Sequence, residues 1–199
     1  MRRFAQAALT VWLGLAGGYA VAQETAPEMA AGRHGSVFVD PLGLLVFGPR
    51  VGVEAGGNQL AGAVYARWFD AGLLSHSLFL GDGDRFAFSW SVGLRGRYYF
   101  SGGQSGFHAG AGAEYLRTRI ETPAAQIASI SAYAVPYAEA GYRWSLTRFY
   151  AGAAAVLGYA ARLSGDVENL PGGDRASTYE ARNKSAVYAS ASLELGMYF

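Results

Sequence analysis

The C-terminal stretch Val187–Phe199 reads Val-Tyr-Ala-Ser-Ala-Ser-Leu-Glu-Leu-Gly-Met-Tyr-Phe. The odd positions hold Val, Ala, Ala, Leu, Leu, Met and Phe, whereas the even positions hold Tyr, Ser, Ser, Glu, Gly and Tyr. A period of two is that of a β-strand with one apolar and one polar face. A strand of this length is unusual in a soluble protein, but it fits one that crosses a membrane with lipid on one side and a polar interior on the other.

The N-terminus predicts export from the cytoplasm. Arg2 and Arg3 precede a mostly apolar run over residues 5–16, and Ala20-Val21-Ala22 has the small-x-small pattern of a signal-peptidase site. The alternative is an uncleaved membrane anchor, which Gln6 and the glycines of the run disfavour. We expect residues 1–22 to be a signal peptide, with cleavage before Gln23.

The composition of residues 23–199 excludes several classes of protein. Without the two arginines of the signal peptide, Lys+Arg falls from 16 to 14 against 15 acidic residues, so the net charge is −1 and a nucleic-acid partner is not expected. The chain has no cysteine, and therefore neither disulfides nor thiol chemistry. No run of about 20 apolar residues predicts a spanning helix. Yet 51% of all residues are hydrophobic and 28 are glycine, a composition that fits a membrane β-barrel.

We predict an all-β fold, a transmembrane antiparallel up-and-down β-barrel of eight strands over residues 36–199. Residues 23–35 form a short periplasmic lead-in. The expected strands are 36–40, 44–56, 59–69, 86–100, 106–120, 129–145, 148–163 and 186–199. The first hairpin is the least defined, because Leu44-Leu45-Val46-Phe47 is continuously apolar and could instead pack as a helical turn.

The expected connections alternate in length. Residues 56–58, 101–105 and 145–148 are short turns, whereas 70–85, 121–128 and 164–185 are longer and more polar. This alternation is expected when turns lie in the periplasm and loops lie outside the cell. An even number of strands also returns the C-terminus to the side of the N-terminus.

One parity of each strand is apolar and is expected to face lipid. Aromatic residues gather near the strand ends, where they would form girdles at the two lipid–water interfaces. The aromatic residues assigned to these girdles are Trp68, Tyr98, Phe100, Phe107, Tyr142, Trp144, Phe149, Tyr198 and Phe199.

The opposite parity collects the charges of the strands and is expected to face the lumen, together with His108. We predict a structural network of ion pairs there, in which guanidinium groups bridge carboxylates. The inward glycines are expected to leave space for the long arginine side chains. The predicted network consists of Arg50, Glu54, Arg67, Arg95, Arg97, Glu114, Glu139, Arg143, Arg162 and Glu194.

An eight-stranded barrel is just wide enough for side chains to fill its interior. We therefore expect a filled, charge-paired lumen and not an open pore. A small gated channel, with the same charges lining its pore, is the alternative.

The architecture resembles the small eight-stranded outer-membrane barrels of the OmpA/OmpX type. The resemblance covers residues 36–199 and rests on architecture, not on a diagnostic motif. Residues 39–45 (Val-Asp-Pro-Leu-Gly-Leu-Leu) are also similar to the opening of a family of uncharacterised bacterial outer-membrane proteins. The ending Tyr198-Phe199 resembles the aromatic signature that the barrel-assembly machinery reads. These resemblances imply a bacterial outer membrane, with its lipids and lipopolysaccharide as surroundings.

No nucleophile–base pair emerges for catalysis, so we expect no enzyme. His34 and Ser36 have a spacing similar to part of the lipid A deacylase motif, but they precede the first strand. His76 lies in a loop, and His108 is inward-facing and far from any obvious serine. Gly81-Asp82-Gly83-Asp84 lacks the remaining acidic positions of a calcium loop, so an exposed turn is favoured over a metal site.

The loop 164–185 is the candidate for binding an extracellular ligand, through Arg175, Arg182 and Lys184, although a merely solvated loop is an equal alternative. We expect an integral outer-membrane protein with a structural or surface-interaction role and without cofactors. The alternatives are a lipid-modifying enzyme similar to lipid A deacylases and a small gated channel.

Overall fold

The computed structural model describes residues 35–42, 48–69, 84–87, 89–172 and 185–199. The predicted signal peptide, the lead-in up to residue 34 and the apolar run 44–47 lie outside the described residues, as do His34, His76 and the three basic residues of the long loop. Within the described ranges, no helix is long and apolar enough to cross a membrane.

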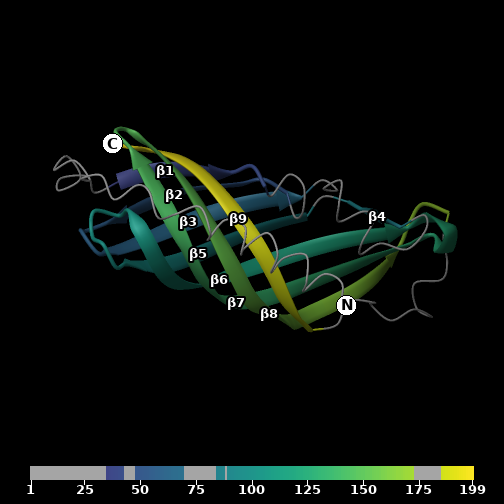
Figure 1. Ribbon diagram of the computed structural model, residues 1–199. Coiled ribbons are helices and arrows are strands. Elements are labelled where there is room, and N and C mark those ends of the chain that lie inside the picture. The colour runs from purple at the N-terminus through teal and green to yellow at the C-terminus, as the bar shows by residue number, and fades with distance from the viewer. Residues whose placement is uncertain (1–34, 43–47, 70–83, 88, 173–184) are drawn as a thin grey trace, which may run out of the picture. The chain divides into compact units, whose positions relative to one another are not determined.

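The described chain is all-β, and its strands form one antiparallel sheet (Figure 1). Eight strands pair in the order β1–β2–β3–β5–β6–β7–β8–β9, and β9 pairs in turn with β1, so the pairings form a cycle. The two-residue strand β4 pairs with the end of β6. The bounds are β1 (Gly35–Asp40), β2 (Arg50–Gly56), β3 (Leu60–Phe69), β4 (Arg85–Phe86), β5 (Ser89–Tyr99), β6 (Gly106–Thr122), β7 (Ile127–Leu146), β8 (Phe149–Asn169) and β9 (Ala186–Tyr198).

The eight predicted strands are all present, but several boundaries were wrong. The second strand begins at Arg50 and not at residue 44, because Gly48 has a φ of 85° and Pro49 follows it. The predicted fourth strand, 86–100, is interrupted after Phe86 and resumes at Ser89. At the interruption, Ser89 Oγ donates a hydrogen bond to the carbonyl oxygen of Ala87, 3.2 Å away.

Two of the predicted long loops are shorter than expected. The hairpin between β6 and β7 closes within residues 123–126, through a 3₁₀ turn, η2 (Pro123–Ala125), and Gln126 at a φ of 54°. Strand β8 runs to Asn169, so the first six residues of the predicted loop 164–185 belong to the strand. The strands extend into the predicted loops because β7 pairs with both β6 and β8 there. This pairing satisfies the backbone hydrogen-bonding groups of the extensions.

The connections between strands are short at one end of the sheet and longer at the other. We call the end with the turns 57–59, 100–105 and 147–148 the turn end, and the opposite end the loop end. Both ends of the described chain lie at the turn end, where Ser36 pairs with Tyr198. At the loop end β6, β7 and β8 run past the other strands (Figure 1).

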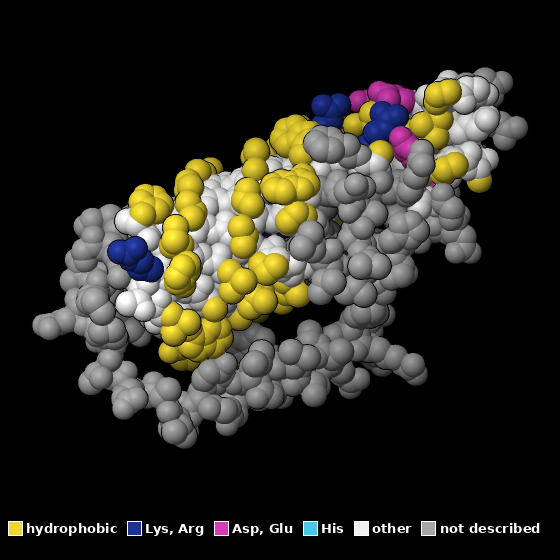
Figure 2. Space-filling view, turned by 90° about the horizontal axis from the view of Figure 1, so that it is seen from above, with side chains coloured by type: hydrophobic (Ala, Val, Ile, Leu, Met, Phe, Trp, Pro, Cys, Tyr) yellow, Lys and Arg dark blue, Asp and Glu magenta, His cyan; other side chains and the backbone are white. Residues whose placement is uncertain are grey.

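The two faces of the sheet are opposite in character. On β9, Glu194 is 2% exposed whereas the neighbouring Leu195 is 46% exposed. The same alternation follows the other strands, so the inner face is polar and buried and the outer face is apolar and exposed. Figure 2 shows hydrophobic side chains covering the face in view, with charged side chains gathered mainly at one end of it. The large exposed apolar residues include Val53, Leu60, Val64, Val92, Leu94, Phe107, Phe149, Leu157, Leu193 and Leu195.

Inner-face glycines make room for aromatic rings more than for arginines, contrary to our expectation. Each of five inward rings lies directly across a strand pair from a glycine, and a Cβ at that glycine would overlap the ring. Two other inner glycines have an arginine side chain near the position of a Cβ: Gly110 has Arg97 at 3.1 Å and Gly152 has Arg143 at 3.9 Å. The five pairs are Phe38–Gly52, Tyr65–Gly93, Tyr137–Gly112, Tyr150–Gly196 and Tyr188–Gly158.

Candidate functional site

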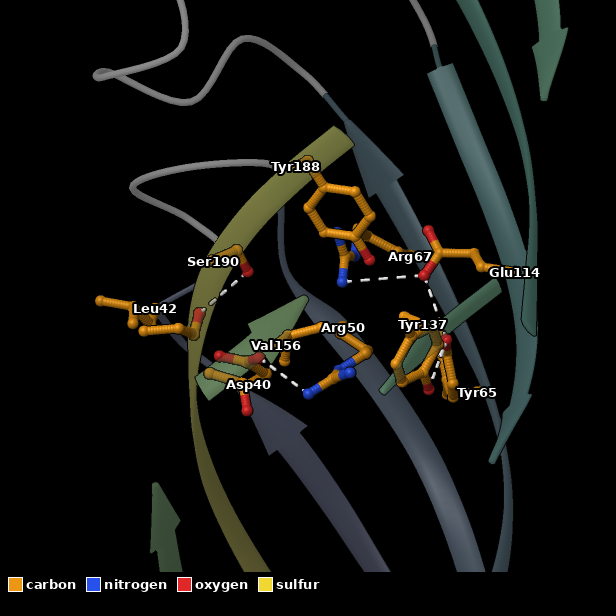
Figure 3. Close-up of a pocket in the computed structure, with 12 residues that line it drawn as sticks. Asp40, Leu42, Arg50, Tyr65, Arg67, Glu114, Tyr137, Val156, Tyr188 and Ser190 are labelled. Atoms are coloured by element: carbon orange, nitrogen blue, oxygen red, sulfur yellow. Dashed lines mark hydrogen bonds and ion pairs between the residues drawn. The ribbon is translucent and has the colours of Figure 1, made fainter. Parts of the chain in front are cut away.

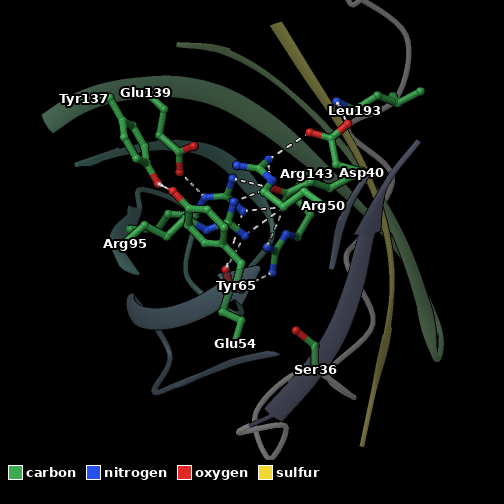
Figure 4. A network of polar contacts seen from close by, with 12 residues as sticks. Ser36, Asp40, Arg50, Glu54, Tyr65, Arg95, Tyr137, Glu139, Arg143 and Leu193 are labelled. Atoms are coloured by element: carbon green, nitrogen blue, oxygen red, sulfur yellow. Dashed lines mark hydrogen bonds and ion pairs between the residues drawn. The ribbon is translucent and has the colours of Figure 1, made fainter. Parts of the chain in front are cut away.

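The inner face carries a network of arginines and carboxylates at the middle of the sheet (Figure 4). The four arginines come from three strands: β2 supplies Arg50, β5 supplies Arg95 and Arg97, and β7 supplies Arg143. Each is at most 3% exposed. We call these arginines, with Asp40, Glu54, Glu139 and Glu194, the central network; it contains four basic and four acidic groups and is therefore neutral.

Glu194 on β9 is the acceptor with the most arginine partners in this network. Arg97 binds it as a fork, with Nη1 donating to Oε2 at 2.7 Å and Nη2 to Oε1 at 3.0 Å. Arg95 also donates to both oxygens, and Arg50 Nη2 donates to Oε1 at 2.9 Å. Such charge-assisted bonds to a planar fork are the strong class of protein hydrogen bonds.

Glu54 and Glu139 extend the network across the ring of strands. Arg143 Nη1 donates to Glu54 Oε1 at 2.6 Å, and the hydroxyl of Tyr99 donates to the same oxygen at 3.2 Å. Arg97 joins the two acidic groups, because its Nε donates to Glu139 and its Nη1 lies 3.5 Å from Glu54 Oε2. The network thus connects β2, β5, β7 and β9 through side chains alone.

Aromatic rings hold the guanidinium groups from the other side. The Cζ of Arg95 lies 4.5 Å from the centre of the Phe38 ring, and that of Arg143 lies 4.0 Å from the Tyr150 ring. Arg50 similarly lies 5.1 Å from Tyr65. These contacts stabilise a desolvated cation without further carboxylates. The glycines opposite three of these rings, those of Phe38, Tyr65 and Tyr150, are therefore part of the same arrangement.

A second, looser group lies on the loop-end side of the central network (Figure 3). Arg67 and Glu114 are 3.9 Å apart, and the hydroxyl of Tyr65 donates to Glu114 at 3.1 Å. The hydroxyls of Tyr65 and Tyr137 are 3.0 Å apart. A cavity of about 30 Å³ between this group and the central network is lined also by Tyr188 and is large enough for about two water molecules.

Nine of the ten predicted network residues belong to these two groups. Arg162 keeps the inward register, opposite the buried Tyr133, but it lies nearer the loop end. Its Nε donates to the carbonyl oxygen of Ser164 at 3.4 Å, and within the described ranges its side chain forms no bond to the network. A register shift between Ala132 and Tyr133, where β7 pairs with β8, places Leu163 as an extra residue beside it. Asp40 was not predicted as a member of the network, but it accepts a hydrogen bond from Arg50 at 3.0 Å. The alternation of residues 36–40 places it inward.

Tyr198 lies inside the sheet and not in an aromatic girdle, so that assignment was wrong. It is 6% exposed, its ring packs against Tyr150 at 5.0 Å, and its hydroxyl donates to the carbonyl oxygen of Gln104 at 3.1 Å. Phe199 is 73% exposed. The two residues of the predicted assembly signal therefore have different surroundings.

His108 and Ser36, the two candidate catalytic residues within the described ranges, do not form a catalytic pair. His108 is buried against Tyr99, with ring centres 5.3 Å apart. The hydroxyl of Ser36 lies 3.4 Å from that of Tyr150. Among the described residues, no three or more His, Cys, Asp or Glu side chains are arranged to hold a metal ion.

Comparison with known proteins adds no relative: no family model matches the chain, and neither a curated protein nor a solved structure is detectably similar to it. The structure itself defines the class. It is an all-β protein with one antiparallel sheet, an exposed apolar outer face and a buried, neutral charge network on its inner face.

Proposed function

We propose that this chain is an integral outer-membrane protein whose eight paired strands form a transmembrane up-and-down β-barrel. One observation carries the proposal: the charged side chains of the central network are buried inside, and large apolar side chains are exposed outside. Exposed contiguous apolar surfaces of this extent are rare on soluble monomers. In a membrane this apolar outer face would be in contact with lipid and would not be exposed to water.

The free-energy cost of placing charges in lipid strongly favours an orientation with the charged face inward and the apolar face outward. An arginine on the lipid face at mid-bilayer costs about 2–4 kcal/mol, so the four buried arginines would be costly if the faces were exchanged. Inside the ring of strands each of these arginines has carboxylate partners, and Arg50, Arg95 and Arg143 also have an aromatic ring beside them. The carboxylates and guanidinium groups of the central network are hydrogen-bonded to one another, whereas lipid would offer them no partners.

We further propose that the lumen is sealed and that the protein has a structural or surface-interaction role without catalysis. The neutral central network and its stacked rings fill the middle of the ring, as expected for eight strands. The cavity beside it has room for water only. A gated channel would require these bonds to open together.

The sequence of the termini supports the location. The signal-peptide pattern over residues 1–22 supports export, and the aromatic ending supports recognition by the barrel-assembly machinery. Outer-membrane lipids and lipopolysaccharide would then surround the apolar face. A ligand outside the cell would be bound through residues 170–185, beyond the end of β8.

The experiment is to produce the full-length chain in a bacterial host and to extract it from the membrane fractions. We expect outer-membrane location, loss of residues 1–22 by mass, a gel mobility that shifts on heating, and no conductance across a planar bilayer. Recovery in the soluble fraction would contradict the membrane proposal. Reproducible unitary current steps would contradict the sealed lumen and favour the channel.

A further inference from the structure

The outer face of β6 changes from apolar to charged at one position. Its outward residues are Phe107, three alanines and Tyr115, and the next is Arg117. Phe107 and Tyr115 are eight residues apart, which is about 27 Å along a strand, or about 20 Å along the membrane normal at a tilt of about 40°. This approaches the height of the apolar band of membrane barrels, about 25 Å. Arg117 therefore stands just beyond the band, at the loop end.

Arg117 lies beside an aromatic pair typical of a membrane interface. Trp90 on β5 is its cross-strand partner, and Trp90 and Tyr115 have ring centres 5.6 Å apart. Tyr115 is 40% exposed on the same outer face. Aromatic side chains at this level occupy the headgroup region, and an arginine can extend from them into it.

The charge of Arg117 is available, whereas that of the next outward arginine is not. Arg119 donates to Glu121 at 3.3 Å and to Glu168 at 3.0 Å. Arg117 is exposed, and in the described part of the chain it forms no ion pair. A planar guanidinium without a carboxylate is suited to bind a phosphate through two parallel bonds.

We propose that Arg117, together with Trp90 and Tyr115, binds the phosphate of a lipid headgroup in the outer leaflet. The inference rests on the proposed membrane barrel, in which the loop end faces the cell exterior. A lipid is favoured over free phosphate because apolar surface lies next to Arg117 on the outer face of β6. The Trp90–Tyr115 pair and the outward alanines of β6 would contact the acyl chains of the lipid whose phosphate Arg117 binds. This lipid site is separate from the extracellular ligand site proposed for residues 170–185.

The test uses full-length protein extracted in a neutral detergent, with lipid binding measured by native mass spectrometry. The probes are bis-phosphorylated lipid A, its dephosphorylated form and sodium phosphate. Arg117→Gln should weaken the binding of bis-phosphorylated lipid A about tenfold or more, as expected for the loss of a charge-assisted bond. The control is Arg148→Gln, an exposed arginine at the turn end, which should leave the affinity unchanged.

Three results would overturn the site: unchanged affinity in Arg117→Gln, an equal loss in Arg148→Gln, or equal binding of the dephosphorylated lipid. Displacement of the lipid by sodium phosphate at equimolar concentration would indicate a free-phosphate site instead. Heat-shift gels and insertion into vesicles are measured on the same wild-type sample. Normal insertion without phosphate-dependent binding refutes this inference alone, whereas failure to insert refutes the proposed barrel and the site with it.

Discussion

Arg97 and Glu194 form a two-pronged ion pair inside the sheet, with Nη1–Oε2 and Nη2–Oε1 distances of 2.7 and 3.0 Å. The two residues are on β5 and β9, which are not neighbours in the sheet. The bond therefore crosses the interior of the ring and does not merely reinforce a strand pair. Arg50 and Arg95 also bind Glu194, and Arg143 Nη2 lies 3.8 Å from its Oε2, so four cations share this carboxylate.

Replacing Glu194 by Gln should destabilise the protein strongly. The variant leaves the four buried guanidinium groups of the central network short of one negative charge. Breaking a buried pair in this way costs about 3–5 kcal/mol. The free energy of unfolding is measured by urea titration in vesicles, followed by tryptophan fluorescence. The matched control is Glu168→Gln, because Glu168 is half-exposed and binds only Arg119 in the described residues. Its effect should be within about 0.5 kcal/mol; equal losses in the two variants would contradict the role of Glu194.

The alternation of residues predicted the fold and much of the site because it is a local property. The parity of Arg97 or Glu194 follows from its neighbours in the chain, so both could be placed inward without knowing which strands meet. The order of pairing along the chain then brought them together. Asp40 could have been found by the same rule, since the alternation of Val37 and Val39 places it inward.

What could not be predicted depended on contacts between distant segments. The extensions of β6 and β8 exist because β7 pairs with both, and no local pattern in residues 121–128 indicated that. Arg162 is outside the network because it lies on β8 beyond Ala160, the last residue of β8 that pairs with β9. The inner glycines were predicted to leave space for arginine side chains, but the register places five of them opposite aromatic rings.

Adding a methyl group at Gly93 should be destabilising because its Cβ would overlap the ring of Tyr65. We expect Gly93→Ala to cost about 1–3 kcal/mol, as overpacking usually does. Gly96→Ala is the control on the same strand, since nothing lies within 4 Å of its Cβ position. That variant should be neutral or slightly stabilising.

The cause can be separated by a double-mutant cycle with Tyr65→Ala. Without the ring, Gly93→Ala should lose most of its effect, and the coupling energy should approach the cost of the single variant. A cost that persists in the Tyr65→Ala background would show that the backbone, and not the ring, requires the glycine.

Tyr198 and Phe199 should act at different stages. Tyr198→Phe removes the hydroxyl that donates to the carbonyl oxygen of Gln104 and lies 3.0 Å from the Ser145 hydroxyl, so the purified protein should lose about 1–2 kcal/mol of stability. Phe199→Ala should leave the unfolding free energy nearly unchanged and lower the amount of assembled protein in cells. The measurements are urea titration and the yield of the heat-shifted gel band. A loss of stability in Phe199→Ala, or a loss of assembly alone in Tyr198→Phe, would contradict these separate roles.

The membrane orientation of the sheet is tested most directly by labels along β9, because the chain has no cysteine of its own. Single cysteines at Ala189, Ser190, Ala191, Ser192 and Leu193 are spin-labelled in protein reconstituted in vesicles, and their collision rates with oxygen and with a water-soluble nickel complex are compared. We predict high oxygen accessibility at the three odd positions, which face outward, and low accessibility to both reagents at the two serines. High accessibility to the nickel complex at the odd positions, or no alternation, would contradict a sheet that lies in lipid.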